Sequence, residues 1–345
     1  MSDGNTPSIS RRSVGLALAA IAAGARPVRA QPSNPVDVRS FGAVGDGVTD
    51  DTAALTRAHA SGQALVYPKT GGYFRTTQPL VVRADVLGRG GEIRIAGNGS
   101  NNRELLRVNA DAPPLTISGL VLDGEYEDGT AGEWSHAIAL RSARGTRIRN
   151  NVIRRPYGDC IYVGVSDATK APCQDIVIEN NVLQHPRRCA VAVISADRVR
   201  ISGNRIDSRH GYVAAIDLEP NRDGADRVHD VAITGNRFEV MGVFVLVTAG
   251  LQGPTTGVVI RHNSGRATVF TSVTRTANLH TGAVQDNTFI SGAPGKGAFL
   301  RADQAEGLVV DGNTDTTPCG QGGYNSVSPG ATRGVVLGNN RFCRR

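Results

Sequence analysis

The chain repeats a short pattern of apolar and polar positions that ends on asparagine. In each copy, an apolar, a variable and a second apolar residue are followed by polar or small residues and then by Asn. The clearest copies end at Asn151, Asn181, Asn204, Asn236 and Asn263, and weaker ones end at Asn287, Asn313 and Asn340. Alternation with period two is typical of a strand with one buried face. The pattern therefore predicts a series of short strands, each followed by a corner that carries Asn.

The intervals between copies favour one kind of repeat architecture. The copies recur every 23 to 32 residues, and an earlier one, residues 116–120, has Gly119 in the Asn position. A coil of strands tolerates such variation, whereas helical repeats keep a nearly constant length. Stacked parallel strands lie about 4.8 Å apart, so Asn side chains on successive coils can form a hydrogen-bonded ladder. Asn also adopts the left-handed backbone that a sharp corner needs. We therefore expect an all-β fold, a parallel β-helix; nine ordered copies disfavour a β-sandwich with Asn-Gly hairpin turns.

A second apolar strand lies between successive Asn corners. Alternation places the residues Ile138, Ile161, Val191, Ile216 and Phe244 inside the coil. The residues that follow them point outward on one sheet and are expected to form a lateral stripe of Ala139, Tyr162, Ala192, Asp217 and Val245.

The first thirty residues have the features of a targeting segment. Residues 10–16 contain paired arginines, an apolar stretch runs from Val14 to Ala23, and residues 28–30 fit a small-residue cleavage site. We expect residues 1–30 to be a twin-arginine-type signal peptide and residues 31–345 to be the β-helix domain. The protein would then work in the periplasm or be secreted. The alternative is a disordered basic N-terminus. No later apolar run is long enough to span a bilayer.

Composition narrows the candidate partners and cofactors. The formal net charge is +7, and removal of residues 1–30, which hold four Arg and one Asp, lowers it to +4. This balance permits attraction to an anionic polymer, and no basic run or aromatic-interleaved basic patch indicates nucleic acid. No Cys/His spacing is typical of zinc, so no metal site is predicted. Cys319 and Cys343 are the candidate disulfide, while Cys160 and Cys189 are expected to be buried free thiols.

The segment before the coils, residues 36–55, resembles the opening segment of the pectate-lyase-like superfamily, which includes rhamnogalacturonases, polygalacturonases and phage tailspikes. The resemblance continues through residues 64–68 and 72–74, and together with the Asn coils it covers almost all of residues 36–343. It implies a single-stranded right-handed parallel β-helix. Thr49 or Asp50 can cap a helix over about residues 51–60, which would cover the open end of the first coil. The many Asp residues here are therefore expected to be structural.

The strongest candidate catalytic pair is Asp217 and Glu219. They flank the inward-facing Leu218, so both carboxyls project from one face, roughly 6.5–7 Å apart along the strand. Two such acids suit a proton donor with a base or a nucleophile, and their proximity should raise the pKa of one of them. The alternative is a pair of structural carboxylates that are paired with nearby Arg.

Two further catalytic candidates come from partial resemblances. The segment around Asp159 resembles the Gly-Asp-Asp-Cys-Ile motif of polygalacturonases, and residues 209–211 are similar to their Gly-His-Gly, which points to His210. Only one Asp is present at 159, no Asn-Thr-Asp motif precedes it and no Arg-Ile-Lys motif follows. The polygalacturonase mechanism is therefore not transferred, and His210 is either a catalytic helper or a loop hydrogen-bonder.

Basic and aromatic residues near these acids are candidates for substrate binding. Arg187 and Arg188 can bind a uronate carboxylate in bidentate fashion or stabilise an enediolate, unless they form a solvated turn. The only tryptophan can stack on a sugar ring or pack within its loop. The full set of expected binding residues is Arg187, Arg188, Arg209, Tyr162, Trp134 and His136.

The leading functional expectation is a secreted carbohydrate-active enzyme, a glycoside hydrolase that cleaves a polysaccharide with paired carboxylates. One alternative is a polysaccharide lyase or C5-epimerase on a uronate polymer, in which Arg209, His210 or Tyr162 is the base and calcium can take part. No cofactor is expected otherwise. A second alternative is a non-catalytic carbohydrate-binding β-helix. The expected partner is a polysaccharide, which the basic charge allows to be anionic, and the expected assembly is a monomer or a homotrimer.

Overall fold

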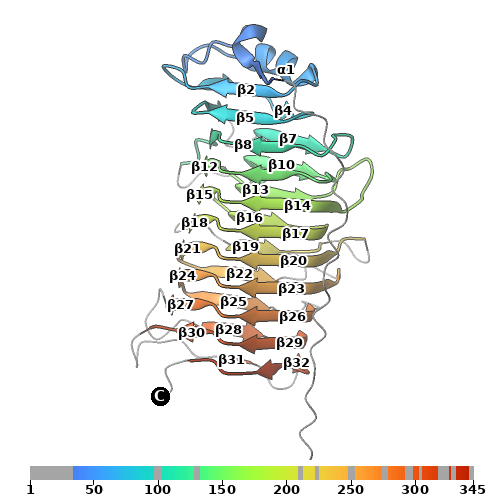
Figure 1. Cartoon of the computed structure of the whole chain (residues 1–345), viewed down its shortest axis with the longest axis vertical. Coiled ribbons are helices and arrows are strands. Elements are labelled where there is room, and N and C mark those ends of the chain that lie inside the picture. The colour runs from blue at the N-terminus through green and yellow to red at the C-terminus, as the bar shows by residue number, and fades with distance from the viewer. Residues whose placement is uncertain are drawn as a thin grey trace, which may run out of the picture. The chain divides into compact units, whose positions relative to one another are not determined.

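The computed structural model describes a solenoid of parallel strands wound in three sheets (Figure 1). The residues that it describes are 34–96, 103–127, 133–208, 213–221, 225–247, 253–273, 279–291, 298–302, 305–317, 326–327 and 332–341. The expected signal peptide, residues 1–30, lies outside these ranges. Among the described residues, no helix has the length and the apolar character needed to cross a membrane.

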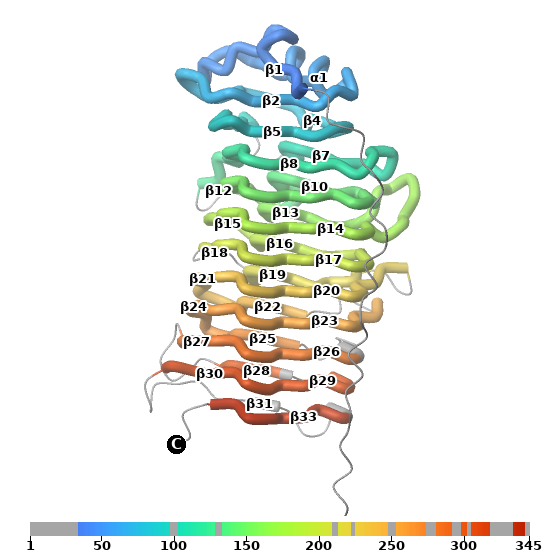
Figure 2. Tube along the Cα trace, viewed as in Figure 1, coloured from blue at the N-terminus to red at the C-terminus, as the bar shows by residue number. Residues whose placement is uncertain are grey.

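The three sheets take one strand each from successive coils, which the Cα trace follows from coil to coil (Figure 2). Sheet A contains β1 (Val36–Asp37), β2 (Leu65–Pro68), β5 (Val86–Arg89), β8 (Thr116–Ser118), β11 (Arg147–Arg149), β14 (Cys173–Glu179), β17 (Ala196–Ser202), β20 (Val228–Thr234), β23 (Thr255–Arg261), β26 (Leu279–Gln285), β29 (Ala305–Asp311), β32 (Thr332–Arg333) and β33 (Val336–Leu337). Sheet B contains β3 (Phe74–Thr76), β6 (Glu92–Ile95), β9 (Val121–Asp123), β12 (Val152–Arg154), β15 (Val182–Gln184), β18 (Arg205–Ser208), β21 (Arg237–Val240), β24 (Ser264–Ala267), β27 (Thr288–Ser291) and β30 (Thr314–Asp315). Sheet C contains β4 (Leu80–Val81), β7 (Leu106–Asn109), β10 (Ile138–Arg141), β13 (Ile161–Gly164), β16 (Val191–Val193), β19 (Ala214–Leu218), β22 (Val243–Val247), β25 (Val269–Val273), β28 (Ala298–Ala302) and β31 (Ser326–Val327).

The core is a stack of β-branched side chains kept in register from coil to coil. In sheet A, for example, Ile148, Ile178, Ile201 and Ile233 are successive register partners and are all fully buried. Branched side chains fill a pleated, buried surface well, and parallel sheets buried on one face need such apolar positions. The expected all-β parallel β-helix is therefore confirmed, including the inward positions of Ile138, Ile161, Val191, Ile216 and Phe244.

The Asn ladder is present at the corner between sheets A and B. Asn204, for example, donates its backbone N–H and its Nδ2 to Oδ1 of Asn236 at 2.9 and 3.0 Å, and its second amide proton to the carbonyl of Ile178. The same contacts link each rung from Asn151 to Asn340. Both amide protons of each Asn up to Asn313 are thus used, as buried polar groups require.

Two details of the predicted corner are wrong. The left-handed residue is not the ladder Asn but the one before it, as Asn150 (φ 55°) and Gly203 (φ 63°) illustrate. Gly119 (φ 70°) is likewise the left-handed residue of its coil, so Leu120, and not Gly119, stands in the ladder position. Leu120 has no amide and donates only its backbone N–H, to Oδ1 of Asn151.

The outward stripe of sheet C also differs at one position. Val245 pairs with the inward-facing Ile216 and is buried in the core, whereas Leu246 is the register partner of Asp217. β22 thus buries two consecutive residues, Phe244 and Val245, where its chain enters the sheet. The outward position predicted for Val245 from strict alternation is therefore wrong.

A helix closes the N-terminal end of the stack, as expected. α1 (Thr52–Ala60) follows the 3-10 helix η1 (Val38–Phe41), and Leu55 and Ala58 of α1 enter the core. Asp50 accepts from the backbone N–H of Thr52 at 3.0 Å, while Asp51 accepts from the N–H groups of Val44 and Gly45. The acids of this segment thus bind backbone donors.

The cysteines that the structure describes are free and buried: Cys160, Cys173 and Cys189. This agrees with the buried thiols expected at Cys160 and Cys189. Cys319 and Cys343 lie outside the described residues.

Candidate active site

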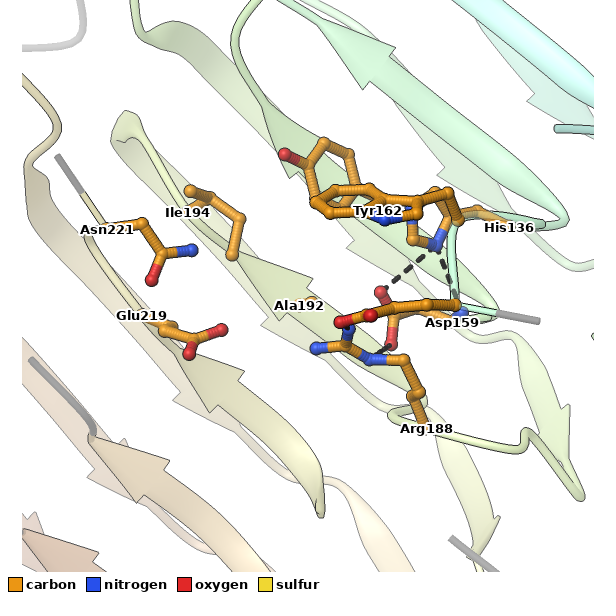
Figure 3. A pocket seen from close by; sticks show the side chains of 10 residues that line it. His136, Asp159, Tyr162, Arg188, Ala192, Ile194, Glu219 and Asn221 are labelled. Atoms are coloured by element: carbon orange, nitrogen blue, oxygen red, sulfur yellow. Dashed lines mark hydrogen bonds and ion pairs between the residues drawn. The ribbon is translucent and has the colours of Figure 1, made fainter. Parts of the chain in front are cut away.

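A cavity of about 250 Å³ opens on the outer face of sheet C, beside the corner where the chain enters that sheet (Figure 3). It is lined by Glu133, Trp134, His136, Asp159, Tyr162, Arg188, Ala192, Ile194, Glu219 and Asn221. Four coils meet here, those of β10, β13, β16 and β19. The last three are aligned by register, because Tyr162, Ala192 and Asp217 are successive outward partners on them. The other lining residues precede β10, β13 or β16 (Glu133, Trp134, His136, Asp159 and Arg188) or follow β16 or β19 (Ile194, Glu219 and Asn221).

Asp159 is fixed at the corner before β13. Its Oδ1 accepts from the backbone N–H of Cys189 at 3.0 Å, and its Oδ2 lies 3.1 Å from Nδ1 of His136. The backbone N–H of Asp159 donates to the same Nδ1 at 3.1 Å. This contact makes Nδ1 an acceptor and assigns the imidazole proton to Nε2. His136 therefore orients Asp159 through its backbone, because Nδ1 then has no proton to donate to the Asp159 carboxylate.

Arg188 lies between the acids of the cavity. Its guanidinium pairs with Glu133, and its Nε lies 3.7 Å from Oδ1 of Asp159. Figure 3 shows the Arg188 and Glu219 side chains pointing toward one another from opposite sides. Arg188 thus reaches the cavity as predicted, although the carboxylates of Glu133 and Asp159 already contact its guanidinium. Arg187 does not line this cavity.

Glu219 follows β19 and is half-buried in the cavity wall. Burial raises its pKa, and the Asp159 carboxylate adds to that effect, while the Arg188 guanidinium and a hydrogen bond from Asn221 oppose it. A carboxyl with a raised pKa is suited to donating a proton near neutral pH.

Asp217 lies below the cavity and does not line it. Its side chain is 1% exposed, and its Oδ1 has no hydrogen-bond partner among the described residues. Burial raises its pKa to about 8, with contributions from the carboxylates of Glu219 and Asp159. Asp217 is therefore mainly protonated at neutral pH, and it adds little negative charge beside Asp159 and Glu219, the two acids that line the cavity.

An aromatic wall borders the acids. The Tyr162 ring stacks on His136 with centroids 4.5 Å apart and an interplanar angle of 16°, and Trp134 packs edge-on against both. Gly164 permits this, because a Cβ at 164 would lie 2.5 Å from the Tyr162 hydroxyl. Burial raises the pKa of Tyr162 to about 12, so the phenol stays neutral. Trp134 remains 42% exposed and presents an apolar surface at the rim.

The structure thus brings together seven of the ten predicted residues at the cavity or directly below it: Asp159, Asp217, Glu219, Arg188, Tyr162, Trp134 and His136. His136 also accepts the backbone N–H of Asp159. Arg209 and His210 lie outside the described residues. Within the described ranges, no group of three or more His, Cys, Asp or Glu side chains is arranged to hold a metal ion.

Sequence reasoning missed Glu133, Ile194 and Asn221. Asn221 lies two positions after Glu219, so the alternation that selected Asp217 and Glu219 also pointed to it. Glu133 lies in a corner with no periodic signal. Only its ion pair with Arg188, two coils away, reveals its place.

Solved structures with this fold include carbohydrate-active and phage proteins. The catalytic domain of Agl-KA superposes with a TM-score of 0.67 at 14% identity, over 90% of this chain and 59% of that one. An exopolygalacturonase from Thermotoga maritima gives 0.62 at 12% identity, over 90% and 87%. A tailspike mutant of E. coli bacteriophage HK620, in complex with a hexasaccharide, gives 0.52 at 12% identity, over 89% and 65%. At such identities these likenesses show the fold alone.

The sequence comparisons identify a family. A search of curated proteins finds no match, but the family model described as "Right handed beta helix region" matches residues 136–342. That span contains every cavity residue except Glu133 and Trp134. It also confirms the right-handed coil that the resemblance to the pectate-lyase-like superfamily implied. The chain therefore belongs to the right-handed β-helix family.

Proposed function

We propose that the protein is a glycoside hydrolase that cleaves a polysaccharide in the cavity on sheet C. The observation that carries this proposal is the pair of carboxyl groups, Asp159 and Glu219, that line one cavity from different coils with Arg188 between them. Glycoside hydrolysis needs one carboxyl that protonates the leaving oxygen and a second that acts as base or nucleophile.

The two environments suggest which acid takes which role. Glu219, whose pKa is raised by burial, is the proposed proton donor. Asp159 accepts a backbone N–H and lies beside Arg188, so it is the proposed base or nucleophile. Asp217, the strongest candidate from the sequence, becomes a buried, protonated neighbour that limits the charge around them.

The surroundings support a carbohydrate substrate. Trp134 and the Tyr162–His136 stack offer apolar ring surface at the rim, which suits the C–H faces of a sugar. A similar fold in an exopolygalacturonase and in a tailspike that binds a hexasaccharide lends support. Residues 1–30 support the further proposal that the protein is exported to the periplasm or secreted.

The reaction type is tested by the products. Purified protein is incubated with pectic, alginate and bacterial exopolysaccharides, and the products are identified by mass spectrometry. Hydrolysis is expected to add one water to each cleaved bond. A 4,5-unsaturated product that absorbs in the near ultraviolet would instead indicate elimination and would overturn the hydrolase assignment.

The assignment of roles is tested by variants. Glu219→Gln and Asp159→Asn should each lower kcat by roughly 10²- to 10⁴-fold, as expected for loss of a general acid or base, while oligosaccharide binding persists. Glu239→Gln, an exposed carboxylate of β21 in sheet B, is the matched control and should keep full activity. Undiminished turnover in Glu219→Gln would exclude Glu219 as the donor.

A further inference from the structure

A second cavity, of about 480 Å³, lies on the same outer face of sheet C toward the N-terminal coils. Its charged core is formed by Glu104, Arg107 and Arg141, and the chain after β13, residues 165–169, forms one side. None of these residues belongs to the candidate active site. The cavity has about twice the volume of the candidate active site, and its size is typical of small-molecule sites.

A buried carboxylate holds two arginines in fixed orientations. Glu104 is 2% exposed; its Oε2 accepts from Nε and Nη2 of Arg107, and its Oε1 accepts from Nε and Nη2 of Arg141, at 3.2 and 2.6 Å. In both guanidiniums Nη1 takes no part in these contacts. The Arg107 and Arg141 side chains remain 37% and 22% exposed. One negative charge and two positive charges leave this cluster with a net positive charge.

The other acids of the cavity have their own cations. Asp111 pairs with Arg83 at 2.6 Å, and Asp167 pairs with Lys170 at 2.8 Å. Asp167 also interacts electrostatically with Arg141 and Arg107, but the three acids Glu104, Asp111 and Asp167 and the four cations Arg83, Arg107, Arg141 and Lys170 still sum to a net charge of +1. A guanidinium whose fork is held in place is well suited to bind a planar carboxylate in bidentate fashion, and prior orientation lowers the entropic cost of binding.

The two cavities are neighbours along one column of residues in sheet C. Arg107, Ala139, Tyr162, Ala192 and Asp217 are successive register partners across sheet C. The Arg141 guanidinium lies 4.6 Å from the centroid of the Tyr162 ring, and Tyr162 lines the candidate active site. From β10 to β19 there are three strand spacings, or roughly 14 Å. An oligosaccharide, rather than a single sugar, is needed to reach both cavities.

We propose that Arg107 and Arg141, oriented by Glu104, form a carboxylate-binding subsite for a uronic acid unit of the polysaccharide. This inference rests on the proposed function, and it makes the substrate an acidic polysaccharide that lies across the coils of sheet C. The uronate would bind on the N-terminal side of the acids Asp159 and Glu219.

Binding is measured by calorimetry in the Glu219→Gln background, so that turnover does not interfere. The probes are hexamers of galacturonate, mannuronate and guluronate and the same hexamers after reduction of their carboxyls. The double variant Arg107→Gln/Arg141→Gln should bind the acidic hexamer at least about tenfold more weakly, with an unchanged Kd for the reduced one. Arg200→Gln, an exposed arginine of β17 in sheet A, removes one charge elsewhere and should have no effect.

A second variant controls for the effect of the arginine substitutions on stability. Loss of both arginines leaves Glu104 buried and unpaired, which can destabilise the protein. The triple variant, with Glu104→Gln added, removes that charge and should show the same selective loss. The subsite is overturned if no acidic hexamer binds the Glu219→Gln background, if the Kd for that hexamer does not change, or if the acidic and reduced hexamers lose affinity equally.

The outcomes separate this inference from the proposed function. Hydrolysis of a neutral polysaccharide, with no effect of the arginine substitutions, would leave the hydrolase and remove the subsite. Arginine-dependent binding of an acidic hexamer without hydrolysis of any polymer would keep the subsite and remove the hydrolase.

Discussion

Asp217 illustrates how burial decides the role of a single residue. It lies on the outward side of β19, yet its register partner there is Ala192, which belongs to a small buried cluster with Tyr162, Cys189 and Ile194. Repulsion from Glu219 was expected to raise the pKa of one acid. The larger cause at Asp217 is burial, and Glu219 comes second.

The raised pKa of Asp217 predicts a pH dependence of stability. Between its ordinary pKa of 3.8 and the folded value of about 8, the folded state binds more protons at this site than the unfolded state, so the contribution of Asp217 to stability falls as pH rises. Asp217→Asn stays neutral. In urea unfolding, the free energy of unfolding of Asp217→Asn minus that of the wild type should therefore increase by at least about 1 kcal/mol from pH 5 to pH 9.

The exposed Asp175 provides the control for this measurement. A hydrogen bond from Arg198 lowers its pKa, so Asp175→Asn should show no such gain at high pH. A difference between Asp217→Asn and wild type that stays constant from pH 5 to pH 9 would contradict the buried, protonated state.

At the scale of the elements, the ladder explains how strands stay in register while the loops vary. Each rung fixes the same corner between sheets A and B, so differences in coil length are confined to the other two corners. Asp159 and Arg188 lie at the corner between sheets B and C, and Glu219 lies at the corner between sheets C and A, where length is free to change. The fold therefore separates the corner that sets the register from the two corners that carry the candidate chemistry.

Removing an inner rung should be costly. Asn204→Ala would leave the N–H and Nδ2 of Asn181 without their acceptor, and it would remove the side-chain donor to Oδ1 of Asn236, which keeps only the backbone N–H of residue 204. We expect a loss of about 2–4 kcal/mol in the free energy of unfolding, because unsatisfied buried polar groups cost about 1–3 kcal/mol each. Asn340→Ala removes the half-buried last rung and should cost less than half as much. Equal losses in urea unfolding would contradict the ladder as a source of stability.

At the scale of the whole solenoid, stability depends on contacts between neighbouring coils and on the covered end. Leu55 of α1 is fully buried against the first coils. Leu55→Ala should cost about 2–5 kcal/mol, and the loss should be local. Hydrogen exchange should speed up in β2 and β5, while β16 and β19 keep their protection. Val44→Ala, at an exposed position of the same end, is the control, and a uniform loss across all coils would contradict this picture.

The sequence alone was sufficient for the parallel β-helix, the Asn ladder, the capping helix and the outward stripe as far as Asp217. These features follow from local chemistry: alternation sets which side chains are buried, and a repeated amide marks each corner. The errors arose where local rules compete. Asn and Gly both adopt the left-handed backbone, so the pattern could not show that Asn150, and not Asn151, takes it. Strict alternation also fails at Val245, because the chain buries two consecutive side chains where it enters the sheet.

Only the tertiary structure decided which acids face the cavity. Asp159, Arg188 and Glu219 come from different coils, and their proximity depends on loop paths that periodicity does not encode. The same holds for Glu104, whose two arginines come from β7 and β10. Burial is a property of neighbours rather than of a position in the chain. For that reason the sequence could place Asp217 on the outward side of its strand, but only the stacked coils show that it lies buried under the site, where its pKa is raised.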